Sequence, residues 1–437
     1  MLNKINSLCS STRMLILIIL MLMISTIPIF IGTKYFIFRT ENIFIENSVT
    51  PPSKLFQYSL EDRNNKRWQN LEDQYRFLNL TLLTNPSLIS DKTIIYQCQS
   101  VCGGLGDRIR GLIMCYFLSI LLNRQLVVDM EQPCRFTNYF QPNKYQWKSA
   151  SGYNFKGSRR HIVCIDYNDQ LANELKTTAF IDSWSKYDNI KISINIDFIQ
   201  EIFSNVHLQS HPIIAMFLKE MSVGEANYQT LFSLFYEILL RPTQPIVQII
   251  DNFLLNRSIE HLICTHLRIG RNPSNPRDHQ FEYRDQITPT ILDFLTKTKL
   301  LERNPRASLF VSSDSSSAID EILQHFPHQS FSIPGPILQI DLPTNVDCDA
   351  GFTKVVADFY MLSECRTVIL TNSGFSAYAN RRRFDPYGNL FKYNQKQNQV
   401  QKCLDLRSPQ GWLPHRSMAI KLFCPVQTSN YSLEDIL

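Results

Sequence analysis

The stretch Leu262–Arg271, of sequence LICTHLRIGR, constrains the fold most, because an apolar run turns abruptly basic at its end. The apolar half predicts a short buried strand. In open α/β sheets, ligands bind in the crevice outside the carboxyl ends of the strands, so we expect His266, Arg268 and Arg271 at a binding site. Arginine offers a planar, always charged fork that matches phosphate oxygens. The stretch therefore predicts a diphosphate site, with a strand ending in a solvated basic loop as the alternative.

Strands and helices alternate after this stretch. We expect a helix that Thr288 caps, with Pro289 at its first position, and that runs to about Leu301. The pattern further predicts strands at Ser308–Ser312 and Thr367–Thr371 and helices at Ser313–Phe326, Thr353–Cys365 and Asn372–Arg383. Such alternation is typical of a parallel, Rossmann-like sheet in an α/β protein. Three polar strand ends can then converge on one ligand: His266–Arg271, Ser312–Asp314 and Asn372–Ser376.

The first half of the chain contains a glycine-rich loop between two predicted strands, Thr93–Gln97 and Gln125–Asp129. The loop and the start of the following helix read Cys102–Gly111, with glycine at positions 103, 104 and 106. These glycines permit a tight turn and a close backbone approach, and the helix N-terminus offers N–H groups to an anion. The loop lacks the P-loop lysine and does not fit G-x-G-x-x-G, so a purely structural turn is the alternative.

The longest apolar run, Met14–Ile31, is about as long as the shortest membrane-spanning helix. A cleaved signal peptide is the alternative, but the run exceeds the usual apolar region of such peptides and no A-x-A-like cleavage site follows it. We therefore expect a retained signal-anchor. Ten of the 11 cysteines follow it, and so do three N-x-S/T acceptor sites, at Asn79, Asn256 and Asn430. These features predict a type II membrane protein with a lumenal body. We expect Cys115 and Cys264, in apolar segments, to be buried thiols.

A chain of 437 residues is too long for one core, so we expect two domains and additional segments. The predicted divisions are a cytoplasmic tail (1–13), the anchor (14–31), a stem (32–90) with one amphipathic helix around Trp68–Leu82, and two Rossmann-like domains (91–240 and 241–437). Leu240–Pro245, of sequence LRPTQP, is the predicted hinge between the domains. A net charge of +5 is small for this length and argues against a dedicated nucleic-acid-binding protein.

Four short blocks resemble the fucosyltransferase superfamily with GT-B fold, in which they occur in the same order. They are Cys102–Arg108 (CGGLGDR), His266-x-Arg268, Ser312–Asp314 (SSD) and Asn372–Ser376 (NSGFS). The first block and Arg241–Thr243 look most like plant-type xyloglucan fucosyltransferases, and the His-x-Arg block is similar to nodulation, α1,6- and protein O-fucosyltransferases. The resemblance covers roughly Thr93–Arg383. It implies two Rossmann-like domains that face a cleft, an N-terminal acceptor domain, a C-terminal nucleotide-sugar domain and GDP-fucose as the donor.

The resemblance also implies roles for individual residues. His266 would bind the nucleotide, Arg268 the pyrophosphate as the catalytic clamp, and Asp314 the guanine edge. Ser373 and Ser376 would hold the phosphates at a helix N-terminus. The remaining residues that we expect to bind substrate are Gly103, Gly104, Gly106, Arg108, Arg271, Gly374 and Phe375. The α1,6 and α1,2 families usually show His-x-Arg-Arg, whereas Ile269 and Gly270 precede Arg271 here, so the linkage stays open.

Arginine and backbone N–H groups can stabilise the charge that develops on departing GDP, so the resemblance predicts an enzyme without a metal or other cofactor. Asp347-Cys-Asp349 matches an Asp-x-Asp metal motif but lies in a cysteine-containing loop. Asp107, beside the glycine loop, is the candidate general base for an acceptor hydroxyl. Its alternative role is to cap the following helix.

These observations predict a Golgi type II membrane glycosyltransferase that moves fucose from GDP-fucose to a glycan hydroxyl with inversion. Another sugar nucleotide or a protein acceptor stays possible within the same enzyme class. The alternative outside it is an inactive pseudotransferase that binds a glycan or a nucleotide sugar. Arg268, Asp314 and the Ser373 loop favour the enzyme, because a glycan-binding module has no need of a pyrophosphate site.

Overall fold

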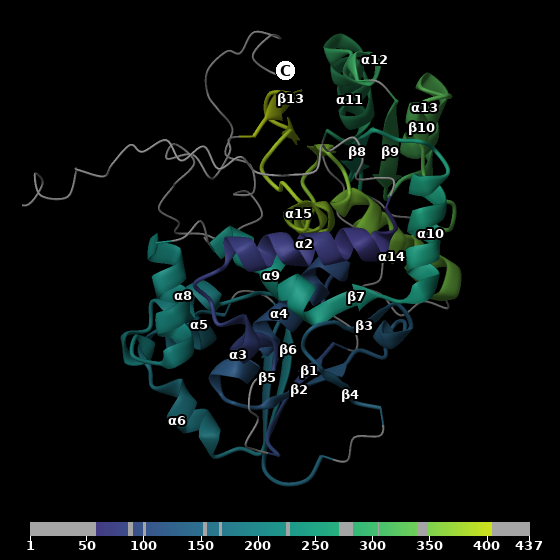
Figure 1. The fold of residues 1–437 in the computed structure, drawn as a ribbon. Helices are drawn as coiled ribbons and strands as arrows, with labels where there is room; N and C mark the ends of the chain where they lie inside the picture. Colours follow the sequence, from purple (N-terminus) through teal and green to yellow (C-terminus); the bar gives the residue numbers. More distant parts are fainter. Residues whose placement is uncertain are drawn as a thin grey trace, which may run out of the picture. The chain divides into compact units, whose positions relative to one another are not determined.

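Two sheets, one from each half of the chain, form the framework of the protein (Figure 1). The computed structural model describes residues 58–85, 91–98, 102–151, 155–165, 168–223, 228–270, 283–304, 306–338 and 348–403. These residues belong to one unit, Pro51–Leu437. The predicted signal-anchor at 14–31, Arg271, Asp347 and Asn430 lie outside the described residues. Within the described ranges, no helix has the length and apolar character needed to cross a membrane.

The first sheet is entirely parallel, with the strand order β4-β2-β1-β6-β5. Both strands predicted for this half are present, and Thr93 of β1 lies opposite Gln125 of β2 and Asn189 of β6. The helix between them, α4 (Leu105–Leu121), packs on the sheet, where a Cβ on Gly111 would lie 2.0 Å from the carbonyl oxygen of Ile194. The strands are β1 (Thr93–Gln97), β2 (Gln125–Asp129), β4 (Lys148–Ser149), β5 (Arg159–Cys164) and β6 (Asn189–Ile194).

The second sheet has the order β10-β9-β8-β11-β12-β13 and is parallel except for the final pair. Its strands are β8 (His261–Leu267), β9 (Ala307–Ser313), β10 (Ser330–Phe331), β11 (Thr367–Leu370), β12 (Leu390–Asn394) and β13 (Gln399–Lys402). The chain leaves β8 on one side toward β9 and β10 and returns on the other side as β11, so the strand order reverses at β8. This reversal is the topological switch point at which α/β sheets bind ligands. Both halves thus confirm the predicted α/β class.

The remaining elements are mostly helices that cover the sheets. In the first half they are α3 (Leu80–Thr84), α5 (Asp169–Thr177), α6 (Phe180–Ser185), α7 (Ile199–Phe203), α8 (Pro212–Val223), α9 (Tyr228–Leu239) and two 3-10 turns (Phe136–Asn138 and Val206–Leu208). In the second they are α10 (Gln244–Leu255), α11 (Arg284–Thr298), α12 (Leu300–Arg303), α13 (Ser316–His325), α14 (Cys348–Ser363) and α15 (Gly374–Arg381). At the predicted hinge, β7 (Leu240–Pro242) pairs antiparallel with β3 (Phe140–Pro142).

Three predicted helix starts are wrong, and one of them is α14, which begins at Cys348 instead of Thr353. α11 begins at Arg284, so Pro289 lies inside the helix and Thr288 is buried instead of capping it. The apolar contacts of Ile287 and Ile291 continue across the proline and outweigh its local preference for a first turn. The helix predicted around Trp68–Leu82 is instead α2 (Leu60–Gln74), which Ser59 caps, followed by α3.

Helix α2 packs into the protein body, although it lies in the predicted stem (purple in Figure 1). Arg63 Nε lies 3.0 Å and Arg67 Nη2 2.8 Å from the carboxylate oxygens of Glu364, just after α14. The side chains of Arg63 and Glu364 are fully buried. Arg382, after α15, approaches the same carboxylate at 3.5 Å. Charged residues of α2 therefore belong to the interior of the fold.

Disulfide bonds and a shared core join the two halves. Three disulfides lie within the described residues: Cys98–Cys102, Cys134–Cys348 and Cys264–Cys365. Cys115 is a buried thiol as expected, but Cys264 is not, because Cys365 lies across from it on the neighbouring segment. One continuous hydrophobic core includes side chains of α2, α4, α9, α14 and α15. A smaller cluster lies between the second sheet and the helices α11 and α13.

Candidate active site

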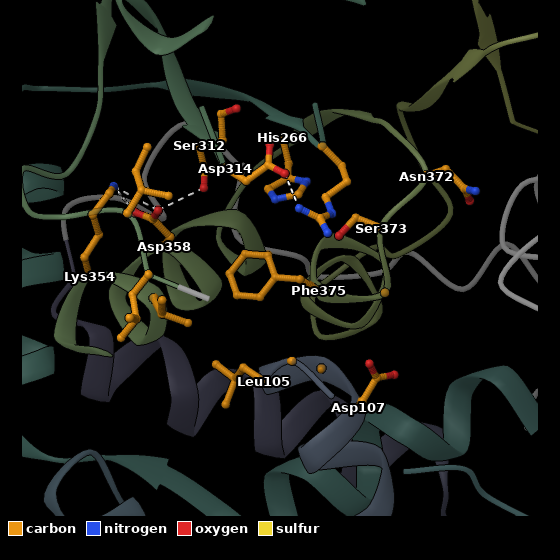
Figure 2. Close-up of a pocket in the computed structure, with 18 of the residues that line it drawn as sticks. Leu105, Asp107, His266, Ser312, Asp314, Lys354, Asp358, Asn372, Ser373 and Phe375 are labelled. Atoms are coloured by element: carbon orange, nitrogen blue, oxygen red, sulfur yellow. Dashed lines mark hydrogen bonds and ion pairs between the residues drawn. The ribbon is translucent and has the colours of Figure 1, made fainter. Parts of the chain in front are cut away.

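A pocket of about 260 Å³ lies between the carboxyl ends of the second sheet and the start of α4 (Figure 2). Its volume is slightly below the usual range for small-molecule sites, roughly 300–1,000 Å³. Loops after β8, β9 and β11 contribute to it, as the three polar strand ends predicted. The lining residues are Gly104–Asp107, His266, Arg268, Ser312–Asp314, Pro336–Leu338, Lys354, Val355, Asp358 and Asn372–Phe375.

Arg268 is held at the pocket by Asp314. The guanidinium of Arg268 forms an ion pair with the Asp314 carboxylate, and the backbone N–H of Arg268 donates to Thr371 Oγ1 at 2.7 Å. The same carboxylate accepts backbone N–H groups of Ile269 at 2.7 Å and Gly270 at 2.9 Å. Both oxygens of Asp314 are therefore engaged in fixing the loop after β8. This geometry makes Asp314 a positioning residue for Arg268, while its contact with a guanine edge stays a prediction.

His266 is buried at the end of β8 and lines the pocket beside Phe375, with 5.3 Å between the ring centroids. Burial lowers the pKa of His266, Asp314 opposes this shift and Arg268 adds to it, so that the pKa is about 4. The imidazole is therefore neutral near pH 7. Among the described residues, its Nδ1 has no hydrogen-bond partner. A neutral ring with one unengaged nitrogen can contact a nucleotide without repelling Arg268.

The N-terminus of α15 forms a second wall of the pocket. Ser373, Gly374 and Phe375 line it, and Ser373 is the N-cap residue. The first N–H groups of a helix attract anions, so this wall and Arg268 attract the same negatively charged ligand. Ser376 is fully buried and its hydroxyl donates to the Ser373 carbonyl at 3.4 Å. Ser376 therefore supports the turn and is not among the lining residues, contrary to its predicted phosphate contact.

The glycine-rich loop brings a second helix N-terminus to the pocket. Gly103 has a φ of +78°, which favours glycine, and Gly104 is the N-cap of α4. A Cβ on Gly106 would lie 3.0 Å from the carbonyl oxygen of Gly374 and 2.9 Å from Cδ2 of Tyr378. Only a glycine therefore lets the starts of α4 and α15 approach this closely. Gly104 and Gly106 line the pocket, whereas Gly103 is not among the lining residues.

Arg108 does not line the pocket, although we expected it to bind substrate. It is buried beneath the loop, and its guanidinium donates to the carbonyl oxygens of Gly103 at 3.0 Å, Gln132 at 3.0 Å and Cys98 at 3.4 Å. Three backbone acceptors hold the charge in place. The side chain thus fixes the glycine-rich loop from behind.

Asp107 lies on α4, across the pocket from Asp314 and Ser373 (Figure 2). It is the third residue of the helix, and Gly104 is the N-cap, so the alternative prediction that Asp107 caps α4 is wrong. Its side chain is 29% exposed and lies 3.2 Å from Arg110 Nη2. A partly exposed carboxylate on the wall opposite Arg268 is placed to accept a proton from a molecule in the pocket.

Lys354 and Asp358 of α14 form a polar cluster that sequence reasoning missed (Figure 2). Lys354 Nζ lies 3.0 Å from Asp358 Oδ2 and donates to the Ile333 carbonyl at 2.7 Å, and Ser312 Oγ donates to the same carboxylate at 2.9 Å. Burial raises the pKa of Asp358, and Lys354 and Ser312 oppose this shift. The sequence contains a pattern that could have revealed this cluster: Lys354 and Asp358, two opposite charges four residues apart, interrupt the apolar face of α14.

The possible metal motif Asp347-Cys-Asp349 lies partly outside the described ranges. No group of three or more His, Cys, Asp or Glu side chains in the described part of the chain could hold a metal ion. Asp349 is exposed in the first turn of α14, while Asp347, the other carboxylate of the possible motif, is not described.

Comparisons with known proteins give matches among solved structures only. No protein-family model and no curated protein matches the chain. A GDP complex of a mutant Arabidopsis thaliana FUT1 matches with 14% identity and a TM-score of 0.49, covering 77% of this chain and 80% of that one. NodZ α-1,6-fucosyltransferase soaked with GDP-fucose matches with 15% identity, a TM-score of 0.44 and coverages of 70% and 96%. Apo POFUT1 matches with 13% identity, a TM-score of 0.43 and coverages of 69% and 97%. The chain is thus similar to these three solved structures, at identities of 13–15%.

Proposed function

We propose that the protein transfers fucose from GDP-fucose to a hydroxyl group of a glycan acceptor, with inversion at the anomeric carbon. The observation that carries this proposal is the convergence of Arg268, fixed by Asp314, with the N-termini of α4 and α15 in one pocket. GDP departs with at least two negative charges. A preorganised guanidinium and two helix N-termini stabilise that charge as the bond to the sugar breaks.

The donor would lie along the pocket with its diphosphate between Arg268 and Ser373–Phe375. His266 would contact the nucleotide as a neutral group. Asp358 is a second candidate among the described lining residues for the N1–H and amino group of guanine, although Lys354 and Ser312 engage its carboxylate as Arg268 engages that of Asp314. Residues 241–437 would then form the nucleotide-sugar domain of a GT-B transferase, and residues 91–240 the acceptor domain.

In the transfer step, the acceptor oxygen attacks C1 of fucose on the face opposite the phosphate. The C1–O bond to the β-phosphate breaks, its electron pair stays on GDP, and Asp107 accepts the proton of the acceptor hydroxyl. Arg268 and the helix N–H groups neutralise the leaving group, so the reaction needs no divalent metal. The protein is thereby a fucosyltransferase without a cofactor.

We also propose that the protein is a type II membrane protein of the Golgi with a lumenal body. The apolar run Met14–Ile31 supports a signal-anchor. Three disulfides support an oxidising compartment, since such bonds are rare in the cytosol. Asn79 and Asn256 are exposed, as glycosylation acceptors must be.

A nucleotide-release assay with a panel of GDP-, UDP- and CMP-sugars tests the proposed activity, with and without a chelator. We expect release of GDP from GDP-fucose in the presence of acceptor glycans, unchanged by EDTA. Tight binding of GDP-fucose without turnover on any acceptor would favour the pseudotransferase. Loss of activity in EDTA that manganese restores would contradict the metal-free mechanism and direct attention to Asp347 and Asp349.

A further inference from the structure

Arg110 lies one helical turn after Asp107 on α4 and pairs with its carboxylate. Its Nη2 lies 3.2 Å from Asp107 Oδ1, and its Nε donates to the Asn195 carbonyl at 2.7 Å. Its guanidinium also lies over the ring of Tyr378, 5.7 Å from the centroid. Arg110 is 12% exposed and is not among the lining residues of the pocket. One side chain thus connects the wall of the pocket to two other elements.

Two elements besides α4 hold Arg110, and one of them, α15, also lines the pocket. Asn195 follows β6, which pairs with β1 where the first sheet reverses its strand order. Tyr378 belongs to α15, whose N-terminus lines the pocket. A second carboxylate, Asp197, interacts electrostatically with Arg110; it is 7% exposed, and among the described residues its Oδ1 has no hydrogen-bond partner. The Asn195 carbonyl, the Tyr378 ring and the Asp197 carboxylate therefore hold Arg110 in place without any ligand.

Asp107 needs such an anchor. Its χ1 has three staggered wells, and as the third residue of α4 its carboxylate can turn toward the N–H groups of the first turn. Gly104, the N-cap, provides no side-chain acceptor for those N–H groups. One of its oxygens, Oδ2, already lies over the glycine loop, 2.6 Å from where a Cβ on Gly103 would be, and Arg110 holds the other, Oδ1. Without Arg110, both oxygens can turn to the helix end.

We propose that Arg110 is a positioning residue that keeps the carboxylate of Asp107 directed at the acceptor hydroxyl. The inference rests on the proposed function. A bond forms between the acceptor oxygen and C1 of fucose, the C1–O bond to phosphate breaks with its electrons on GDP, and the proton moves to Asp107. Arg110 touches none of the reacting atoms and acts through Asp107.

A double-mutant cycle tests this assignment, with kcat, the KM for donor and acceptor, the dissociation constant of GDP and the melting temperature measured for each variant. We expect Asp107→Asn to lower kcat by roughly a hundredfold or more, as loss of a general base does. Arg110→Gln should lower kcat by about tenfold, because Asp107 remains but is misdirected. The double variant should be no slower than Asp107→Asn, and the affinity for GDP should stay unchanged in all three. Arg110→Lys should recover part of the loss, because it keeps the charge but cannot span two acceptors.

Arg160→Gln is the matched control. Arg160 pairs with Glu174 at 2.9 Å and lies 4.8 Å from the ring centroid of Trp184. Its substitution therefore removes an ion pair and an aromatic contact, as Arg110→Gln does, but away from the pocket. We expect it to lower the melting temperature about as much as Arg110→Gln and to keep wild-type kcat.

Normal kcat in Arg110→Gln would overturn the inference, and so would a double variant whose loss equals the product of the two single losses. Equal losses in Arg160→Gln and Arg110→Gln would also overturn it, since the effect would then follow stability alone. Absence of GDP-fucose turnover by the wild-type protein would instead contradict the proposed function itself.

Discussion

At the scale of single residues, the Asp314 carboxylate accepts two backbone N–H groups of the loop that carries Arg268 and also pairs with its guanidinium. Through these contacts Asp314 fixes the loop and acts on a ligand indirectly, in addition to lining the pocket. A loop that is fixed before the ligand arrives needs no reorganisation when charge develops on the diphosphate.

Asp314→Asn separates this role from the contact with guanine that the sequence predicted. We expect the melting temperature to fall, with a loss of about 1–3 kcal/mol in the free energy of unfolding, because a part-buried arginine loses its counter-charge. Turnover should fall at least tenfold, or about 1.4 kcal/mol. The preference for GDP over IDP, which lacks the amino group, should stay unchanged. A changed preference with an unchanged melting temperature would show that Asp314 contacts the guanine edge. Asp358→Asn is the comparison variant, because Asp358 is the other aspartate of the pocket that is a candidate for this contact.

Two buried histidines set the response of stability to acid. Burial, helped by Arg366 and Arg383, lowers the pKa of His261 to about 4, and burial does the same for His266. Each histidine has an ordinary pKa of 6.5 when unfolded, so the unfolded chain binds more protons between pH 6.5 and about 4. Stability is therefore highest above pH 6.5 and decreases as the pH falls through this window.

His261→Gln tests whether stability decreases as the pH falls because this histidine binds a proton on unfolding. The wild-type protein should lose at most about 3 kcal/mol per histidine on acidification, and the variant should lose less while matching the wild type near neutral pH. Chemical unfolding at a series of pH values measures the slope. His161→Gln, at an exposed position of β5, should leave the slope unchanged. Identical slopes in wild type and His261→Gln would contradict the account.

At the scale of elements, α2 carries two arginines into a fully buried ion-pair network around Glu364. Burial alone would raise the pKa of Glu364, but Arg67, Arg63 and Arg382 together lower it to about 2. Breaking one partner of such a network leaves an uncompensated buried charge, which is strongly destabilising.

Truncation tests whether α2 is part of the fold. A chain that begins at residue 58 should fold with the melting temperature of the full lumenal body. A chain that begins at residue 91, where the sequence predicted the first domain to start, should be insoluble or lose several kcal/mol of stability, about 3–5 per broken charge network. Equal melting temperatures for both chains would show that residues 58–85 are only a spacer.

The strand β8 could be predicted from its local sequence, whereas the buried position of α2 could not. The strands β1, β2, β8, β9 and β11 are short apolar runs followed by polar residues, so local pattern alone identifies them and their carboxyl ends. Arg63 and Arg67 look like solvated charges, because their partner Glu364 lies about 300 residues away in the sequence. The same limit applies to Asp314, whose type indicated a polar contact but not its partner. β12 and β13 were missed because their sequences, LFKYN and QVQK, are short and partly polar.

At the scale of the whole molecule, Cys134 of the first half is bonded to Cys348 at the start of α14, the helix that carries Lys354 and Asp358. The Tyr139 hydroxyl donates to the Cys348 carbonyl at 2.8 Å, and its ring packs on Phe352 with 4.5 Å between centroids. An oxidising compartment would therefore help to keep the two sides of the pocket together.

The proposed lumenal orientation predicts glycosylation in a secretory host. Treatment with a glycosidase should increase gel mobility, and Asn79→Gln and Asn256→Gln should each remove part of the shift, because both asparagines are exposed. Protease protection of intact microsomes provides the second measurement. No mobility shift, together with cleavage of the body from the cytosolic side, would reverse the orientation.

The central claim is that Arg268 stabilises the departing diphosphate, and GDP-fucose turnover by wild type, Arg268→Ala and Arg268→Lys tests it most directly. We expect Arg268→Ala to lose on the order of a hundredfold or more in kcat, about 3 kcal/mol. Arg268→Lys should remain strongly impaired, since it keeps the charge without the fork. The loss of stability in Arg268→Ala should be no larger than in Asp314→Asn and smaller than the loss in rate, because Asp314 keeps its two backbone N–H donors. Near-normal turnover in Arg268→Ala would contradict the account, as would losses of activity that only follow losses of stability.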